Sequence, residues 1–212
     1  MNVGALTVGT ERRASWRLAA FLALAGVAAI AFVALAAVPY YLSSAYGPPE
    51  YAPRRGWLML HISGGVVAIL TGPVQLWLGL ADRGVAWHRR MGLVYMAAVG
   101  VGAIGAYYMA FQTDVGWVFG AALAALATAW VTTTAMAFLA IKRSLVEQHK
   151  EWMIRSYVLT FAFVLFRIVQ PMLQNVGTIT EQLAGAAWLC WTLPLLATEL
   201  VLQGRKILRV RA

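Results

Sequence analysis

The sequence predicts an all-α fold, namely a polytopic membrane protein built as a bundle of six transmembrane helices. Hydrophobic residues make up 61% of the 212 residues and charged residues only 12%, whereas a soluble domain carries about 25% charged residues. The mean hydropathy is +0.71. The apolar residues also form six continuous runs, each close to the ~20 residues that a helix needs to cross the ~30 Å hydrocarbon core.

These runs fill nearly the whole chain, so residues 1–212 are expected to form a single transmembrane domain. The expected spans are residues 16–42, 56–80, 91–111, 117–141, 152–173 and 183–203. Helices are expected because lipid offers no hydrogen-bond partner to an unpaired backbone group. A β-barrel strand would instead alternate apolar and polar residues over about 10 positions. The first run is longer than the about 7–15 apolar residues of a signal peptide, which favours a retained span.

Basic residues orient the bundle, because all four segments that flank the spans on one side are rich in them. These segments contain Arg12, Arg13 and Arg17, then Arg83, Arg89 and Arg90, then Lys142, Arg143, Lys150 and Arg155, and finally Arg205, Lys206, Arg209 and Arg211. The loops on the other side contain only Arg54 and Arg55. The positive-inside rule therefore predicts that both termini are cytoplasmic. The net charge of +9 follows from this topology and indicates a lipid bilayer as the partner, with no nucleic acid.

The fifth run carries polar residues along one helical face. His149, Ser156, Thr160 and Arg167 fall within about 40° of one another at ~100° per residue. The stripe predicts either a polar path from the inner to the outer surface or a helix packed by small hydroxyl residues.

Polar side chains on the other runs extend this pattern into two layers at different depths. The inner layer is expected to contain Gln75, His88, Tyr95, His149 and Glu199. The outer layer is expected to contain His61 and Arg167, which would form an outward-opening pocket. An apolar middle is expected between the layers, and intramembrane polar residues of this kind are candidates for function because they are costly to place there.

Two histidines at one depth on different helices suggest a haem or metal site. His88 and His149 precede the third and fifth runs on the inner side, and a bis-imidazole b-type haem needs two such ligands. Arg89 and Arg155 are candidates for neutralising the propionates. The same histidines are the candidate metal ligands, although a structural zinc site takes about four ligands. The alternative is that both histidines are interfacial residues among basic neighbours.

Three segments carry a resemblance to a known family. They read LHISGGVVAILTGPVQ, WHRRMGLVYM and EQHKEWMIRSYVLTFAFVLFRIVQP. Together they resemble an uncharacterised bacterial integral membrane family, domain of unknown function 2306, over roughly residues 58 to 199. The resemblance implies a helical fold in the bacterial inner membrane and no particular reaction. Its motif positions include His61, Gln75, His88, Tyr95, His149, Arg155, Ser156, Thr160, Arg167 and Glu199.

A weaker likeness in layout is to the six-span transmembrane b-type cytochromes that pass electrons from ascorbate across membranes. That layout implies histidines near the starts of the second to fifth spans, and His61, His88 and His149 match three of these places. The fourth run has no histidine, so at most the inner haem, between His88 and His149, is implied.

Several functions remain open on these grounds. The first is electron transfer through an inner b-type haem, with a quinone or a membrane redox protein as partner. The second is a transporter or small-molecule and anion binder that uses the layer of Arg167 and His61. The third is a non-catalytic membrane scaffold or regulator, and a metal-dependent membrane enzyme is the fourth.

The charge asymmetry makes the topology testable. Reporter fusions at both termini are expected to give cytoplasmic signals, and a fusion after Gly116 is expected to give a periplasmic signal. A periplasmic terminus or a cytoplasmic Gly116 junction would contradict the six-span topology.

Overall fold

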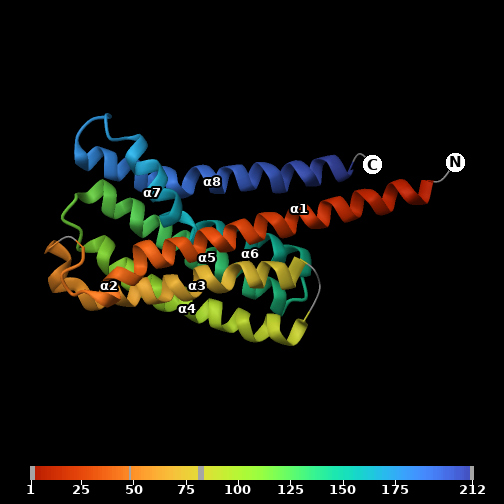
Figure 1. Ribbon diagram of the computed structural model, residues 1–212, viewed down its shortest axis with the longest axis horizontal. Coiled ribbons are helices and arrows are strands. Elements are labelled where there is room, and N and C mark those ends of the chain that lie inside the picture. The colour runs from red at the N-terminus through yellow and green to blue at the C-terminus, as the bar shows by residue number, and fades with distance from the viewer. Residues whose placement is uncertain (1–2, 48, 81–83, 211–212) are drawn as a thin grey trace.

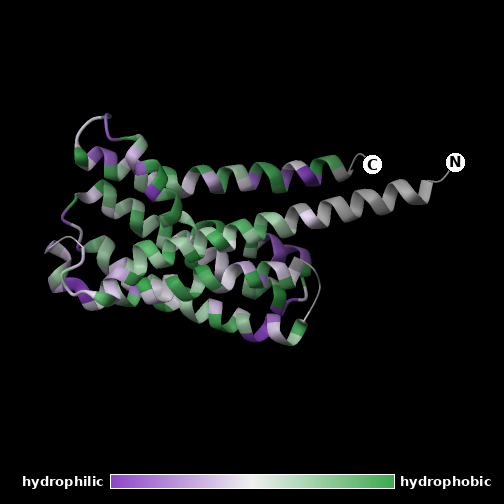
Figure 2. Ribbon diagram, in the orientation of Figure 1, coloured by the Kyte–Doolittle hydropathy of each residue, from purple (hydrophilic) through white to green (hydrophobic). Residues whose placement is uncertain are grey.

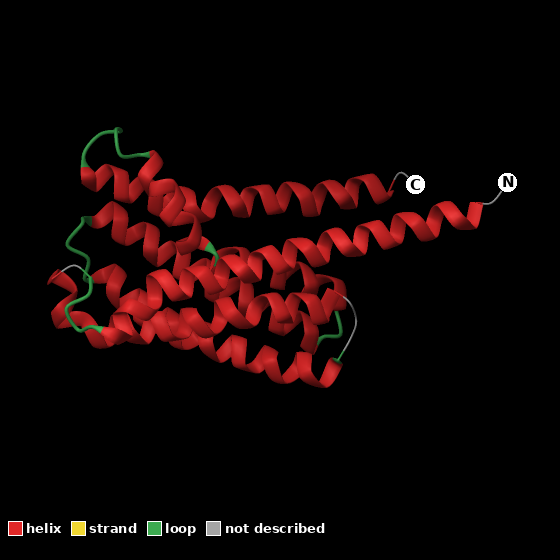
Figure 3. Ribbon diagram, viewed as in Figure 1, coloured by secondary structure: helices red, strands yellow, loops and turns green. Residues whose placement is uncertain are grey.

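The computed structural model describes residues 3–47, 49–80 and 84–210. Every regular element in this part of the chain is a helix (Figure 3). The elements are α1 (Val3–Phe32), a π-helical turn η1 (Val33–Ala37), α2 (Val38–Leu42), a 3-10 helix η2 (Pro49–Arg54), α3 (Arg55–Leu80), α4 (Val85–Phe111), α5 (Trp117–Lys142), α6 (Val146–Thr160), α7 (Ala162–Met172) and α8 (Ile179–Val210). The prediction of an all-α membrane bundle is confirmed.

Five helical stretches of the described chain are long and apolar enough to cross a membrane. They cover Ala19–Leu42, Tyr51–Gly79, Val85–Phe111, Trp117–Lys142 and Ile179–Leu208. A sixth span results if α6 and α7 are taken together, although they are bent by 45° where they meet. The described helices therefore give five candidate spans, or six if the bent pair of α6 and α7 is one span.

The polar residues lie at the ends of the bundle and the apolar residues along its sides. Figure 2 shows hydrophilic residues at the connections and mainly hydrophobic residues along the helices. Large apolar side chains such as Leu42, Phe111 and Trp117 are 81%, 76% and 83% exposed. Such exposure suits side chains that face lipid tails, which are as apolar as the side chains themselves. In Figure 1, α1 and α8 run beyond α3 to α6 at the end where both termini lie.

Helices α3 and α4 pack backbone against backbone at glycines. A Cβ atom on Gly64 would lie 2.5 Å from the main-chain oxygen of Ala98, and one on Gly105 would lie 2.5 Å from that of Trp57. Any larger side chain would therefore force the two helices apart. Small residues commonly allow such close contacts between membrane helices, and this contact fixes the position of α4 on α3.

Helices α3 and α6 meet at a proline. Pro73 has no N–H group, so the carbonyl of Ile69, four residues earlier, loses its helical partner. The hydroxyl of Tyr157 on α6 donates to this carbonyl at 3.2 Å. Gly72 leaves room for the tyrosine ring, which a Cβ atom at that position would overlap. Pro73 thus lies at the point where α6 packs on α3.

The far end of the bundle is held by arginines. Arg54 donates to both carboxylate oxygens of Asp114 at 2.7 and 3.2 Å. This charged hydrogen bond lowers the pKa of Asp114. Arg55 donates to the carbonyls of Tyr40, Ser43 and Ser44, where the first span ends.

The contact at Pro73 predicts a coupling between two substitutions. Tyr157→Phe is expected to destabilise the protein by about 1 kcal/mol, because it leaves the Ile69 carbonyl without a partner. In a Pro73→Ala background, the N–H of residue 73 can bond Ile69 again, so the same change should cost clearly less. Unfolding of the purified protein in detergent measures both values.

Tyr107→Phe is the matched control for this cycle. It removes a hydroxyl that contacts Thr128 at 2.8 Å and should cost the same with or without Pro73. Equal costs of Tyr157→Phe in the two backgrounds would contradict the proposed role of its hydroxyl.

Candidate functional site

His88 and His149 occupy equivalent places in their helices. Each is the fourth residue of its helix, after Val85 in α4 and after Val146 in α6. The main-chain N–H of His88 donates to Gly84 and that of His149 to Leu145, both at 2.9 Å. Each side chain is therefore carried by the first turn of a helix, at the end of the bundle that the charge pattern assigns to the cytoplasm.

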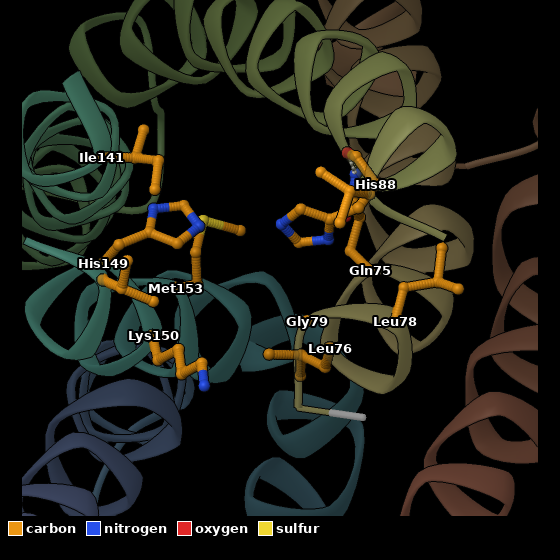
Figure 4. A pocket seen from close by; sticks show the side chains of 11 residues that line it. Gln75, Leu76, Leu78, Gly79, His88, Ile141, His149, Lys150 and Met153 are labelled. Atoms are coloured by element: carbon orange, nitrogen blue, oxygen red, sulfur yellow. Dashed lines mark hydrogen bonds between the residues drawn. The ribbon is translucent and has the colours of Figure 1, made fainter. Parts of the chain in front are cut away.

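The two imidazole rings face each other across a cavity (Figure 4). Their centroids are 6.1 Å apart and their planes are nearly perpendicular, at 88°. The expected approach of His88 and His149 inside the bundle is thus observed, with Gln75 beside them. Glu199, expected as another neighbour, does not line the cavity.

The cavity between the rings has a volume of about 240 Å³ and lies among α3, α4, α5 and α6. Most of its wall is apolar, and its polar groups are the two histidines, Gln75 and Lys150. Figure 4 shows Met153 on the same side as His149, with its sulfur directed into the space between the rings. The lining residues are Gln75, Leu76, Leu78, Gly79, Val85, His88, Ile141, Val146, His149, Lys150 and Met153.

Met153 was not singled out from the sequence as a site residue. It lies four residues after His149 and therefore on the same face of α6. That spacing was the available signal.

The surroundings of His149 fix its tautomer. Its Nδ1 atom lies 2.9 Å from the carbonyl oxygen of Ala137 on α5. A carbonyl only accepts hydrogen bonds, so Nδ1 carries the proton in the neutral ring and Nε2 has a free lone pair. An imidazole held in this way is ready to bind a metal through Nε2.

The surroundings of His88 are less complete. Its Nδ1 atom is buried and has no hydrogen-bond partner among the described residues. Gln75 is 2% exposed, and its amide nitrogen donates to the main-chain oxygen of His88 at 2.8 Å. The amide oxygen of Gln75 is also buried without a partner in the described chain. The wall of the cavity thus contains an unused donor or acceptor on each of two neighbouring side chains.

A hydroxyl cluster continues the polar inner layer deeper into the bundle. The cluster consists of Tyr95, Trp130, Thr134, Ser156 and Thr160. The hydroxyl of Tyr95 contacts those of Ser156 and Thr160, each at 2.8 Å. Tyr95 and Ser156 follow His88 and His149 by seven residues each, so the cluster lies about two turns deeper than the cavity. Trp130 was not predicted from the sequence as a polar partner, although its indole N–H donates to Thr160 at 2.8 Å.

Arg155 does not lie at the cavity, which corrects its assignment to haem propionates. Its guanidinium is buried and pairs with Glu199 on α8 through two hydrogen bonds, the longer of them 3.0 Å. Trp152 stacks on it with a centroid 4.6 Å away. Arg155 follows His149 by six residues, which turns it to another face of α6. Arg89 is exposed beside His88 and stays a candidate.

Arg167 does not face the interior, so the predicted outer pocket of Arg167 and His61 was wrong. Arg167 is exposed on α7. His61 is half-buried, its Nδ1 lies 2.9 Å from the carbonyl oxygen of Gly102, and its ring contacts Phe163. The reason is the break at Phe161, because α7 no longer continues the face of α6. Arg167 is therefore an arginine at the periphery of the bundle.

The pair of Arg155 and Glu199 makes a prediction about stability. Arg155→Leu is expected to cost about 2–3 kcal/mol, somewhat below the value for a fully buried pair, because Glu199 is 36% exposed. The double variant Arg155→Leu/Glu199→Leu should cost less than the single one, since no carboxylate is left unpaired. Unfolding in detergent measures both.

Lys206→Ala is the control, because Lys206 contacts Glu151 at 2.8 Å but is 51% exposed. It should cost less than about 1 kcal/mol. A double variant that is less stable than Arg155→Leu would contradict this account.

Metal ligands are few in the described chain. No group of three or more histidine, cysteine, aspartate or glutamate side chains comes together there. A centre at this cavity would therefore depend on the two imidazoles, with Met153 as the remaining soft donor.

Comparisons with known proteins agree with the membrane fold. Residues 58–202 match the family model described as "Predicted membrane protein (DUF2306)". No curated protein and no solved structure matches the chain. The matched segment begins just before His61 and ends just after Glu199, so it includes both cavity histidines and Gln75. The chain belongs to the family of predicted membrane proteins with the domain of unknown function 2306.

Proposed function

We propose that the protein is a membrane electron-transfer protein that holds a b-type haem between His88 and His149. The observation that carries the proposal is the arrangement of the two rings, whose centroids are 6.1 Å apart. Two imidazoles that bind one metal from opposite sides, at about 2 Å each, place their ring centroids roughly 6 Å apart. Their perpendicular planes also keep the rings from stacking on each other.

The residues around the rings fit such a cofactor. The apolar wall suits a flat hydrophobic ring system, and Gly79 keeps space open beside His88, where a Cβ atom would lie 3.0 Å from Cε1. The volume of about 240 Å³ is slightly below the about 300–1,000 Å³ of small-molecule pockets. Part of a porphyrin would therefore lie outside the enclosed volume. Lys150 in the wall and exposed Arg89 are the basic groups for its propionates.

A bound haem would supply one-electron transfer. The protein residues would control its ligands, its access to water and the distance between its two ligands. His149 presents an unprotonated Nε2 because the carbonyl oxygen of Ala137 accepts a hydrogen bond from Nδ1–H. The apolar wall limits access of water, which influences the redox potential of a metal centre. The hydroxyl cluster below ties α4, α5 and α6 together and fixes the distance between the two ligands.

The proposal also limits where electrons are exchanged. The third histidine of the chain, His61, has its Nδ1 engaged by Gly102 and lies on the outer half. We therefore infer a single haem near the inner surface of the bacterial cytoplasmic membrane, with both termini on that side. The electron partner would be a quinone or a redox protein that reaches this surface. The alternative of an anion transporter loses its main support, because Arg167 lies at the periphery.

Spectroscopy tests the proposal. Protein expressed with abundant haem and purified in detergent is expected to show the absorption spectrum of a six-coordinate b-type haem. His88→Ala and His149→Ala should each abolish that spectrum, because each removes one axial ligand. The pyridine haemochrome assay gives the haem content of every variant.

His61→Ala is the matched control and should keep the spectrum and the haem content. Elution as a single folded species in size-exclusion chromatography separates ligand loss from misfolding. Wild-type protein without haem after expression and reconstitution would overturn the proposal. Equal haem content in wild type, His88→Ala and His149→Ala would overturn the assignment of the ligands.

A further inference from the structure

We propose that Gln75 is the positioning residue for His88. Its side chain holds the first turn of α4 against α3 and accepts, directly or through one bound water, a hydrogen bond from Nδ1–H of His88. The inference rests on the proposed function, since the tautomer that Gln75 would fix leaves Nε2 of His88 free to bind a metal.

The first step is the contact that exists already. The amide nitrogen of Gln75 donates to the main-chain oxygen of His88 at 2.8 Å. This bond joins the last two turns of α3 to the first turn of α4. Residues 81–83 in the connection between these helices lie outside the described chain. Within the described chain, Gln75 joins the two helices directly at His88. It sets the height and direction of the turn from which the imidazole extends.

The second step is the match between two unused groups. Nδ1 of His88 and the amide oxygen of Gln75 are both buried and both lack a partner among the described residues. An unprotonated Nδ1 could not bond to this oxygen, because both would be acceptors. A protonated Nδ1 supplies the donor that the oxygen needs. One water that accepts from Nδ1–H and donates to the oxygen would also satisfy both groups.

The third step is the comparison with His149. There, Nδ1 is already paired with the carbonyl oxygen of Ala137 on the neighbouring helix α5. Metal-binding histidines usually have such an outer partner, which fixes the ring and raises the basicity of the ligating nitrogen. Gln75 on α3 is the corresponding residue for His88. The two ligands would then be supported in the same way from opposite sides of the cavity.

The space around Gln75 is shaped for this role. A Cβ atom on Gly92 would lie 3.3 Å from the amide nitrogen of Gln75, and one on Gly79 would lie 3.6 Å from Nδ1 of His88. Gly92 on α4 thus leaves room for the amide of Gln75, and Gly79 on α3 leaves room for the imidazole of His88. A larger residue at position 92 would press on the amide of Gln75, and one at position 79 would press on the ring of His88.

One other acceptor lies near the ring of His88, namely the main-chain carbonyl of Gln75 itself. It is outside hydrogen-bond geometry with Nδ1, which stays unpartnered, and it belongs to the helical ladder of α3. If this carbonyl were the partner, removing the side chain of Gln75 would leave the tautomer unchanged. Substitution of the side chain therefore distinguishes the two acceptors.

Two substitutions of Gln75 test the inference. Gln75→Leu removes the acceptor, so His88 becomes a weaker ligand for ferric iron and the midpoint potential should rise. Gln75→Glu provides a stronger acceptor, so the potential should fall. Each variant is expected to change the ratio of oxidised to reduced haem at least tenfold, or about 59 mV for one electron. Nitrogen-15 NMR of the histidine side chains should show that His88 carries its proton on Nδ1. In Gln75→Leu this tautomer should no longer be the only form of His88.

Gln182 offers matched controls. It is also buried, at 9% exposure, and its amide donates to the carbonyls of Gln174 and Gly177 at the opposite end of the bundle. Gln182→Leu and Gln182→Glu should leave the potential and the tautomer of His88 unchanged.

Opposite shifts in the two Gln75 variants, with the spectrum retained, would support the inference. Shifts in the same direction, or potentials equal to that of the wild type, would overturn it while the haem proposal stands. If Gln75→Leu does not fold, the potential of Gln75→Glu decides. A wild-type protein that binds no haem would overturn the proposed function, and the NMR tautomer of His88 then still decides whether Gln75 sets it.

Discussion

The carbonyl of Ile69, freed by Pro73 and bonded by Tyr157, is the contact on which the arrangement of the site depends. A free carbonyl is costly in lipid because no water is available to satisfy it. The tyrosine hydroxyl meets this need at 3.2 Å and thereby fixes α6 on α3. Because α6 carries His149 and α3 carries Gln75, this contact places the two walls of the cavity. The glycine contacts of α4 on α3 then place His88 opposite His149.

Depth could be predicted from the sequence, because the distance of a residue from the end of an apolar run gives its depth directly. His88, His149 and Gln75 were placed at one level in this way, and they meet at one cavity. The direction in which a side chain points was less predictable. Arg167 was assigned to the face of His149 on the assumption of one straight helix, but α6 and α7 are bent by 45° at Phe161. Periodicity cannot reveal such a break where no proline or glycine marks it.

Pairs between distant segments were also out of reach. Arg155 was assigned to the haem by its closeness in sequence to His149, yet its partner is Glu199, on α8. The hydroxyl cluster of Tyr95, Trp130, Thr134, Ser156 and Thr160 has the same character, because its members come from three helices. The sequence placed Tyr95 in the inner polar layer and Ser156 and Thr160 in the polar stripe, but it did not predict that these side chains meet. Only the rotation of the helices about their axes brings the hydroxyls together, and that rotation follows from side-chain packing that one sequence does not contain.

The distribution of unsatisfied polar groups supports the proposed role of Gln75 in the cavity wall. Many other buried polar side chains of the described chain are paired, including the hydroxyl cluster and the guanidinium of Arg155. In the described chain, three buried side-chain nitrogen or oxygen atoms have no partner, and two of them belong to Gln75 and His88 in the cavity wall. The third is the indole nitrogen of Trp191 in α8. Since each such atom costs about 1–3 kcal/mol when it stays unpaired, their occurrence in one cavity wall supports the proposal that Gln75 and His88 pair with each other.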